Sequence, residues 1–312
     1  MTIMASLGPV FALLMLGWVL KRSKFPGDAF WPSVERLIYF ICFPALLVVR
    51  LADADFEGEI ALQLVWSILV LLGVATLVLL ALQRFVRFDG AAFTSVYQGS
   101  TRFNTYIALA IAAGVVPGDG VVYAAIITAV MIPPLNVLCV LMFALFKDDR
   151  PSPRRVVITI LQNPLILACL IGIAINMSHI ELPDLLVRVL ALLAQIALPM
   201  GLLAVGAALQ FRSLKTSKSP LFVALLFRAL LMPLFALVVG ALFALPADAM
   251  QILLVFVSVP AASAAYILAR QLGGDAPLMA AILSAQSVMA MVTIPLVLAA
   301  GLWIYPILLG YF

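Results

Sequence analysis

The fold is decided by the stretch YQGSTRFNTYIALAIAAG, residues 97–114. Its second half is apolar enough for a membrane helix, whereas its first half concentrates small, polar and charged residues: Gly99, Ser100, Thr101, Arg102 and Asn104. Glycine, serine and asparagine weaken a helix interior, and an arginine near the centre of a membrane span costs at least about 2.5–3.5 kcal/mol on insertion scales. The sequence therefore predicts a broken helix whose interruption is buried in protein or faces a water-filled cavity.

The composition indicates a polytopic membrane protein. The chain has 312 residues, of which 66% are hydrophobic and only 10% charged, whereas soluble domains have about 25% charged residues. Its mean hydropathy is +1.23, so we expect it to lie in the lipid bilayer without a sizeable soluble domain. The small net charge of +4 and the lack of a polybasic tail speak against a nucleic-acid partner. Three cysteines lie in apolar runs without metal or disulfide spacing and are expected to be packing residues: Cys42, Cys139 and Cys169.

Ten segments are long and apolar enough to cross the hydrocarbon core, which takes roughly 20 residues of helix. They are residues 3–20, 34–51, 60–83, 91–114, 119–146, 156–177, 184–209, 220–244, 248–271 and 277–300. Lysine and arginine mark cytoplasmic loops, and they gather in the odd-numbered connections, from Lys21, Arg22 and Lys24 in the first to Arg270 in the ninth. The even-numbered connections are mainly acidic. This alternation predicts a multi-pass protein of the inner cell membrane with both termini on the outer, periplasmic side.

The second half of the chain repeats the spacing of characteristic residues in the first half. Pro44 and Pro199 are 155 residues apart, and Tyr106 and Tyr266 are 160 residues apart. Five helices per copy is an odd number, so the second copy enters the membrane in the opposite orientation, as in many secondary transporters. The predicted fold is an all-α polytopic membrane protein with ten transmembrane helices, built as two inverted five-helix repeats with broken crossing helices 4 and 9. We also expect Pro44 and Pro199 to kink or pack helices 2 and 7.

The second predicted break lies in helix 9, where Pro260 interrupts the apolar run. Proline has no N–H and clashes with the preceding turn, so a half-helix with free amides follows the break. Opposed half-helix N-termini carry partial positive charge that suits an anion. The predicted substrate-binding residues of both breaks are Gln98, Gly99, Ser100, Arg102, Asn104, Thr105, Tyr106, Ser258, Pro260, Ala262, Ser263 and Tyr266. A guanidinium can bind a carboxylate in a bidentate fork; the alternatives are that Arg102 snorkels or caps carbonyls and that Asn104 only caps the break.

The remaining polar residues have simpler interpretations. Asn136, Gln286 and Ser287 are expected mainly to bond between helices, and Arg228 to snorkel or form a structural pair. Asp119 and Asp275 are typical N-caps of the helices that follow them, and His179 is predicted to lie in an outer loop.

The motifs GSTRFNTYIALA, residues 99–110, and PAASAAYILARQLGGDA, residues 260–276, together with the five-plus-five layout, resemble the auxin efflux carrier family. The chain resembles a bacterial member of it, within the larger group that includes bile acid–sodium symporters. The resemblance implies a scaffold of helices 1, 2, 6 and 7 beside a moving core, an elevator-like exchange and a homodimer. The implied divisions are residues 1–56 and 156–211 for the scaffold and residues 57–146 and 220–312 for the core.

The resemblance also bears on the substrate. Plant auxin carriers have Asn-Pro-Asn-like sequences at both crossings, whereas here Asn104 lacks the proline and Pro260 lacks asparagine. These departures disfavour auxin itself. The resemblance to bacterial members of the family, which are commonly described as malate or malonate permeases, implies a small organic anion, a carboxylate such as malate or malonate, rather than an auxin-like acid. Alternative functions are a sodium-coupled bile-acid-like symporter and a channel or receptor on the same fold.

No carboxylate lies near the middle of a predicted span. A proton therefore has no obvious carrier, whereas Na⁺ could be held by carbonyls and hydroxyls. Proton symport, sodium symport and uniport stay open, and no other cofactor is expected. A single histidine and the lack of buried acids favour a non-enzyme.

Overall fold

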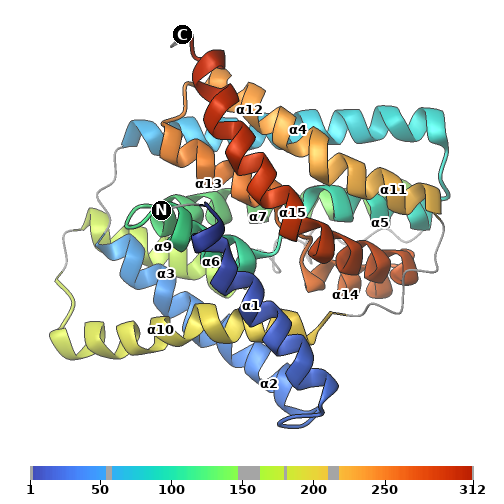
Figure 1. Ribbon diagram of the computed structural model, residues 1–312. Coiled ribbons are helices and arrows are strands. Elements are labelled where there is room, and N and C mark those ends of the chain that lie inside the picture. The colour runs from blue at the N-terminus through green and yellow to red at the C-terminus, as the bar shows by residue number, and fades with distance from the viewer. Residues whose placement is uncertain (1–2, 54–57, 147–161, 179–180, 210–217, 311–312) are drawn as a thin grey trace.

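The computed structural model describes residues 3–53, 58–146, 162–178, 181–209 and 218–310, and all of their regular structure is helical. The first half contains α1 (Ile3–Arg22), α2 (Phe30–Leu37), α3 (Phe43–Ala52), α4 (Gly58–Val86), α5 (Gly90–Thr101), α6 (Thr105–Val115) and α7 (Gly120–Phe146). The second half contains α9 (Pro164–Met177), α10 (Asp184–Ala207), α11 (Lys218–Leu226), α12 (Met232–Leu242), α13 (Ala247–Ser258), α14 (Ser263–Gln271) and α15 (Ala276–Leu308). Figure 1 shows their arrangement.

Five described helical segments are long and apolar enough to cross a membrane: Gly58–Val86, Gly120–Phe146, Asp184–Ala207, Lys218–Leu242 and Ala276–Leu308. Two other predicted spans, 91–114 and 248–271, are each divided into two shorter helices. The start of the predicted span 156–177 lies outside the described residues, as does His179. The structure thus agrees with a polytopic membrane protein, and the total of ten crossings stays a prediction.

Two wide helical turns precede prolines. The π-helical turns η1 (Ile38–Cys42) and η3 (Phe227–Leu231) lead directly into α3 and α12, which have Pro44 and Pro233 in their first turns. A proline offers no N–H to the carbonyl four residues earlier, and a π-turn accommodates that missing bond without ending the helix. Pro199, in contrast, lies inside the continuous helix α10. Pro44 and Pro199 therefore have different local structures.

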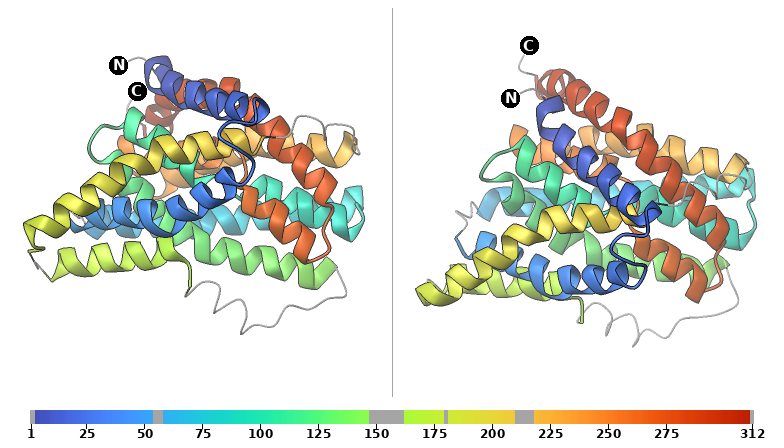
Figure 2. Two further views of the ribbon diagram at one scale, coloured as in Figure 1. Left: turned by 90° about the horizontal axis from the view of Figure 1, so that it is seen from below. Right: turned by 60° about the horizontal axis from the view of Figure 1, so that its bottom comes forward.

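The helices pack in two sets. In the first set, α10 lies against both α1 and α3, and α3 also lies against α9. The seam between α1 and α10 is very close, because a Cβ on Gly17 would meet the Leu203 carbonyl and a Cβ on Gly206 would meet the Leu14 carbonyl. Small residues allow such backbone approach between membrane helices. The second set surrounds the buried helix pieces α5, α6 and α13, and the two further views in Figure 2 show both sets.

The two divided segments cross. Helix α5 packs against α14, and α6 packs against α13, so the first piece of each segment lies beside the second piece of the other (Figure 1). The sequence prediction that both segments are broken is confirmed. The interruption lies at residues 102–104, just after the Gly99–Thr101 run in which the sequence suggested it, because these three residues form the last turn of α5.

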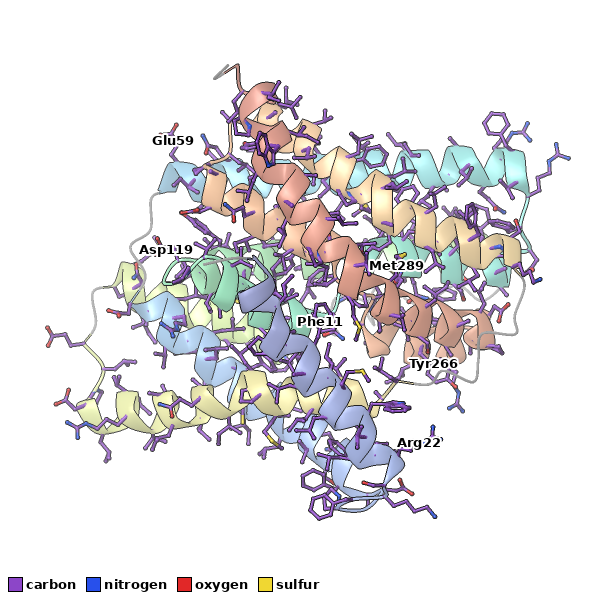
Figure 3. The ribbon with its side chains drawn as sticks, in the orientation of Figure 1. Phe11, Arg22, Glu59, Asp119, Tyr266 and Met289 are labelled. Atoms are coloured by element: carbon purple, nitrogen blue, oxygen red, sulfur yellow. The ribbon has the colours of Figure 1, made fainter. Side chains whose placement is uncertain are left out.

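Three charged residues can be placed at the ends of the helix bundle. Glu59 and Asp119 lie at one end and Arg22 at the other (Figure 3). The start of α1 and the end of α15 lie toward the same end (Figures 1 and 2). Asp275 caps α15 as predicted, since its side chain accepts from the Leu278 N–H at 2.9 Å. For Asp119 it is the backbone carbonyl that accepts a bond, from the Tyr123 N–H.

Candidate functional site

The two breaks meet through the backbone. Residues 102–104 connect α5 to α6, residues 259–262 connect α13 to α14, and the Asn104 N–H donates to the Pro260 carbonyl at 2.8 Å. The residues that end the first pieces have nearly the same extended conformation: φ −73°, ψ 150° for Arg102 and φ −65°, ψ 151° for Val259. The chain therefore leaves both first pieces in the same way, although the side chains at those positions differ completely.

This geometry corrects the register expected between the halves. Tyr106 is the second residue of α6, whereas Tyr266 is the fourth residue of α14. A shift of two residues turns a side chain roughly half-way around a helix, so the two tyrosines point to different surroundings. Tyr106 stacks on Phe43 of α3 with ring centroids 4.6 Å apart. Tyr266 instead lies beneath the guanidinium of Arg270, 6.0 Å from its ring centroid.

The two second pieces begin differently. Asn104 caps α6, since its side-chain oxygen accepts from the N–H groups of Tyr106 and Ile107 at 3.1 and 3.2 Å. Ala262, the corresponding residue before α14, offers no side-chain cap. The first N–H groups of a helix have no intrahelical partner. The start of α14 is therefore the more available of the two positive helix ends.

Arg102 points toward α7. Its Nη2 donates to the side-chain oxygen of Asn136 at 2.6 Å, and its Nε lies 3.3 Å from the sulfur of Cys139. Both partners are neutral, so the guanidinium keeps its charge without a salt bridge to them. Cys139 thus has a polar contact in addition to the packing role that was expected. Asn136 forms an interhelical bond as expected, and its partner is a predicted site residue. Neither contact was evident from the sequence, because the partners are 34 and 37 residues from Arg102.

Three predicted site residues place buried polar atoms near the breaks. The amide group of Gln98 and the hydroxyls of Ser100 and Ser258 are buried and have no hydrogen-bond partner among the described residues. A buried polar group without a partner is costly, so this set next to the breaks needs an explanation, and a bound polar ligand would supply one. Gly99 is the close-packed neighbour of this set, where a Cβ would meet the side chain of Ile282.

The other predicted residues are spread around the crossing. Thr105 opens α6 and is partly exposed. Pro260 supplies the carbonyl that Asn104 uses. Ser263 begins α14, and its side chain lies outside the described parts. The structure therefore brings the two breaks together but leaves Tyr266 in a separate contact with Arg270.

Two buried side chains hold the crossing. Gln286 forms the interhelical bonds that were expected of it, whereas the carbonyl partners of Arg228 were not evident from the sequence. Gln286 of α15 donates from Nε2 to the Gly99 carbonyl at 2.8 Å and accepts from the Ala261 N–H at 2.9 Å. Arg228 of η3 donates to the carbonyls of Ser100, Phe256 and Val259. Of the two expectations for Arg228, snorkelling is wrong, because its side chain is fully buried. A structural role fits the contacts, with backbone carbonyls as the partners. Each of these residues thus contacts both broken segments.

A small, mostly apolar cavity lies beside the crossing. Its lining comes from α1 and α10 on one side and from α6, Pro260 and α15 on the other: Phe11, Leu14, Ile107, Val205, Leu209, Pro260, Ser287, Ala290 and Met291. Its volume of about 10 Å³ is near the minimum for one water molecule. The two sets of helices therefore meet next to the Pro260 break with little free space between them.

The comparisons with known proteins point to membrane transport. Residues 147–298 match a family model described as membrane transport protein. Over 292 residues the chain is 22% identical to an uncharacterized transporter of Methanothermobacter thermautotrophicus, in an alignment that covers 92% of this chain and 94% of that protein. Together with the apolar helices, these similarities support a multi-pass membrane protein and favour a transporter over an enzyme.

Proposed function

We propose that the protein is a secondary transporter that carries a small organic anion, a carboxylate such as malate or malonate, past the crossing of its two broken helices. The single observation that carries this proposal is the meeting of the breaks, with the uncapped start of α14 beside them. Half-helix N-termini at a break are a recurring way to bind anionic groups in transporters.

The charge at the crossing supports an anion. Arg102 is bonded to the neutral Asn136 and Cys139 and has no acidic partner among the described residues, so its guanidinium could pair with a carboxylate. The unpartnered amide group of Gln98 and hydroxyl of Ser258 add donors near the same breaks. These polar groups supply orientation, whereas the free amides of α14 and the guanidinium supply the attraction.

The packing supports movement of the second helix set relative to the first. A small cavity lies where α1 and α10 pack against α6 and α15, and Tyr106 reaches across that boundary to Phe43 of α3. We propose the divisions 1–56 and 156–211 as the scaffold and 57–146 and 220–312 as the moving core of an elevator. In the proposed orientation both termini face the outside of the inner membrane, and the scaffold forms the dimer contact.

Ala262→Asp tests the anion site directly. An aspartate at an N-cap accepts from the helix amides and typically stabilises by about 1 kcal/mol relative to alanine, so it would act as a tethered carboxylate. We expect this variant to melt at a higher temperature than wild type and to show no further stabilisation by malate or malonate. Wild type should be stabilised by the anion that it binds.

Arg102→Ala and a serine control complete the test. We expect Arg102→Ala to lose carboxylate uptake in proteoliposomes while it is still recovered as folded protein. Ala262→Ser caps α14 without a charge, so it should retain a measurable response to the anion. A wild type that neither transports nor is stabilised by any member of a carboxylate panel would refute the proposed substrate class.

A further inference from the structure

The buried guanidinium of Arg228 joins the carboxyl ends of the two first pieces. Its Nε donates to the Val259 carbonyl at 2.8 Å and its Nη2 to the same carbonyl at 2.5 Å. Nη2 also donates to the Phe256 carbonyl at 3.1 Å, and Nη1 donates to the Ser100 carbonyl at 3.2 Å. All of these acceptors are backbone oxygens. No acidic side chain pairs with Arg228 in the part of the chain that the structure describes.

The charge balance explains why an arginine is stable there. The carboxyl end of a helix carries roughly −0.5 of an elementary charge, and α5 and α13 both end at this guanidinium. Two such ends amount to about one negative charge, which one guanidinium neutralises. Arginine is the most basic of the side chains, so the guanidinium supplies this compensating charge at neutral pH.

The same position has a different occupant in ion-coupled transporters. There, unwound carbonyls and half-helix carboxyl ends commonly hold Na⁺. We propose that Arg228 is a built-in cation that takes the place of a coupling metal ion at this crossing, so that neither Na⁺ nor K⁺ is needed to hold the broken helices or to bind the anion. The part that concerns anion transport rests on the proposed function, whereas the part that concerns the crossing does not.

The surrounding contacts satisfy the negative helix ends at the crossing but leave the positive start of α14 without a cap. Gln286 satisfies the Gly99 carbonyl and the Ala261 N–H, and Arg228 satisfies three further carbonyls. The negative ends of the broken segments are thus occupied by the protein itself, while the positive start of α14 has no side-chain cap. A crossing that is closed to cations and open to anions follows from these contacts.

Thermal unfolding of the purified full-length protein tests the proposal without any substrate. Melting temperatures are compared in NaCl, KCl and choline chloride at equal ionic strength. We expect wild type to melt at the same temperature in all three salts. Arg228→Ala should melt lower than wild type in choline chloride, and its melting temperature should rise with Na⁺ or with low, non-denaturing guanidinium in a saturable way. Arg84→Ala removes an exposed arginine from α4 and should show no cation response.

The conservative variant separates the charge from a merely structural role. Arg228→Lys keeps a positive charge, so it should melt without Na⁺ dependence even if fewer carbonyls are bonded, whereas the neutral Arg228→Gln should become dependent on cations. A saturable Na⁺ response of wild type would overturn the proposal, and so would folded Arg228→Ala or Arg228→Gln protein that ignores both Na⁺ and guanidinium. If neither neutral variant folds, a Na⁺ response of Arg228→Lys that wild type lacks also overturns it, and equal melting of both in all salts supports it.

Carboxylate uptake in sodium-free and sodium-containing vesicles is measured separately. Equal uptake supports the inference for transport, and uptake that requires Na⁺ contradicts it. Failure to transport any carboxylate would count against the proposed function alone, since the melting experiment is independent of substrate.

Discussion

Asn136 controls the side chain on which the proposed anion site depends. Its oxygen accepts from Arg102 Nη2 at 2.6 Å. Asn136→Asp changes the shape little but places a negative charge there, which would hold the guanidinium in an ion pair and compete with a bound carboxylate. A hydrogen bond to a charged group contributes about 1.5–3 kcal/mol, so we expect at least about tenfold weaker anion binding. Titration calorimetry measures this loss, and unchanged affinity would show that Arg102 does not contact the anion.

Gln286 stabilises the crossing through two hydrogen bonds, one to each broken segment. Gln286→Leu leaves the Gly99 carbonyl and the Ala261 N–H unpaired, and each buried unpaired group costs about 1–3 kcal/mol. We expect a clear fall in melting temperature. Ser287→Ala is the matched control, because the Ser287 hydroxyl bonds only to the Leu283 carbonyl one turn earlier in α15. Equal melting of the two variants would argue against stabilisation of the crossing by the two bonds of Gln286.

Single residues show where sequence reasoning reached its limit. Arg102 was identified as a charged residue at a break because its cost in a span is a local property. For Arg228 a structural role stayed one of two alternatives, and its partners were not evident because they lie 28 to 128 residues away and only the crossing brings them to it. Whether the buried polar atoms of Gln98, Ser100 and Ser258 find partners likewise depends on the side chains of other helices. A local sequence pattern does not contain that information.

At the scale of elements, the two half-helices after the breaks differ in how they begin. Asparagine and aspartate are nearly equal as N-caps, so Asn104→Asp should keep the stability of α6 close to that of wild type. The added negative charge would repel a carboxylate at the proposed site, and we expect anion uptake to be lost. Asn104→Ala should instead lower stability by about 1 kcal/mol. Melting curves with uptake assays distinguish these outcomes, and full uptake by Asn104→Asp would limit Asn104 to capping.

The breaks themselves were predictable, but their alignment was not. Proline, glycine and arginine in apolar runs oppose a helix wherever they occur, so the positions of both interruptions followed from residue chemistry. The offset taken from Tyr106 and Tyr266 misaligned the halves, because α14 begins two residues earlier relative to its tyrosine than α6 does. The π-turn before Pro233 was also missed, since proline alone does not indicate whether a helix kinks, widens or ends.

For the whole molecule, the seam between α1 and α10 is the tightest contact of the first helix set. A Cβ on Gly17 would meet the Leu203 backbone, whereas a Cβ on Gly8 of the same helix meets no atom within 4 Å. Overpacking costs about 1–3 kcal/mol or more. We expect Gly17→Val to lower the melting temperature strongly and Gly8→Val to change it little. Comparable loss in both would show that helix propensity, rather than the seam, explains the effect.

The burial of all three thiols has a practical consequence. Cys42, Cys139 and Cys169 are at most 1% exposed, so a water-soluble maleimide should leave the native chain unmodified. A single new thiol at Phe11, on the α1 wall of the small cavity (Figure 3), would then be the sole reactive position. Its alkylation rate would report how often that wall meets water, and a change of that rate with added carboxylate would reveal the opening and closing of the pathway in real time.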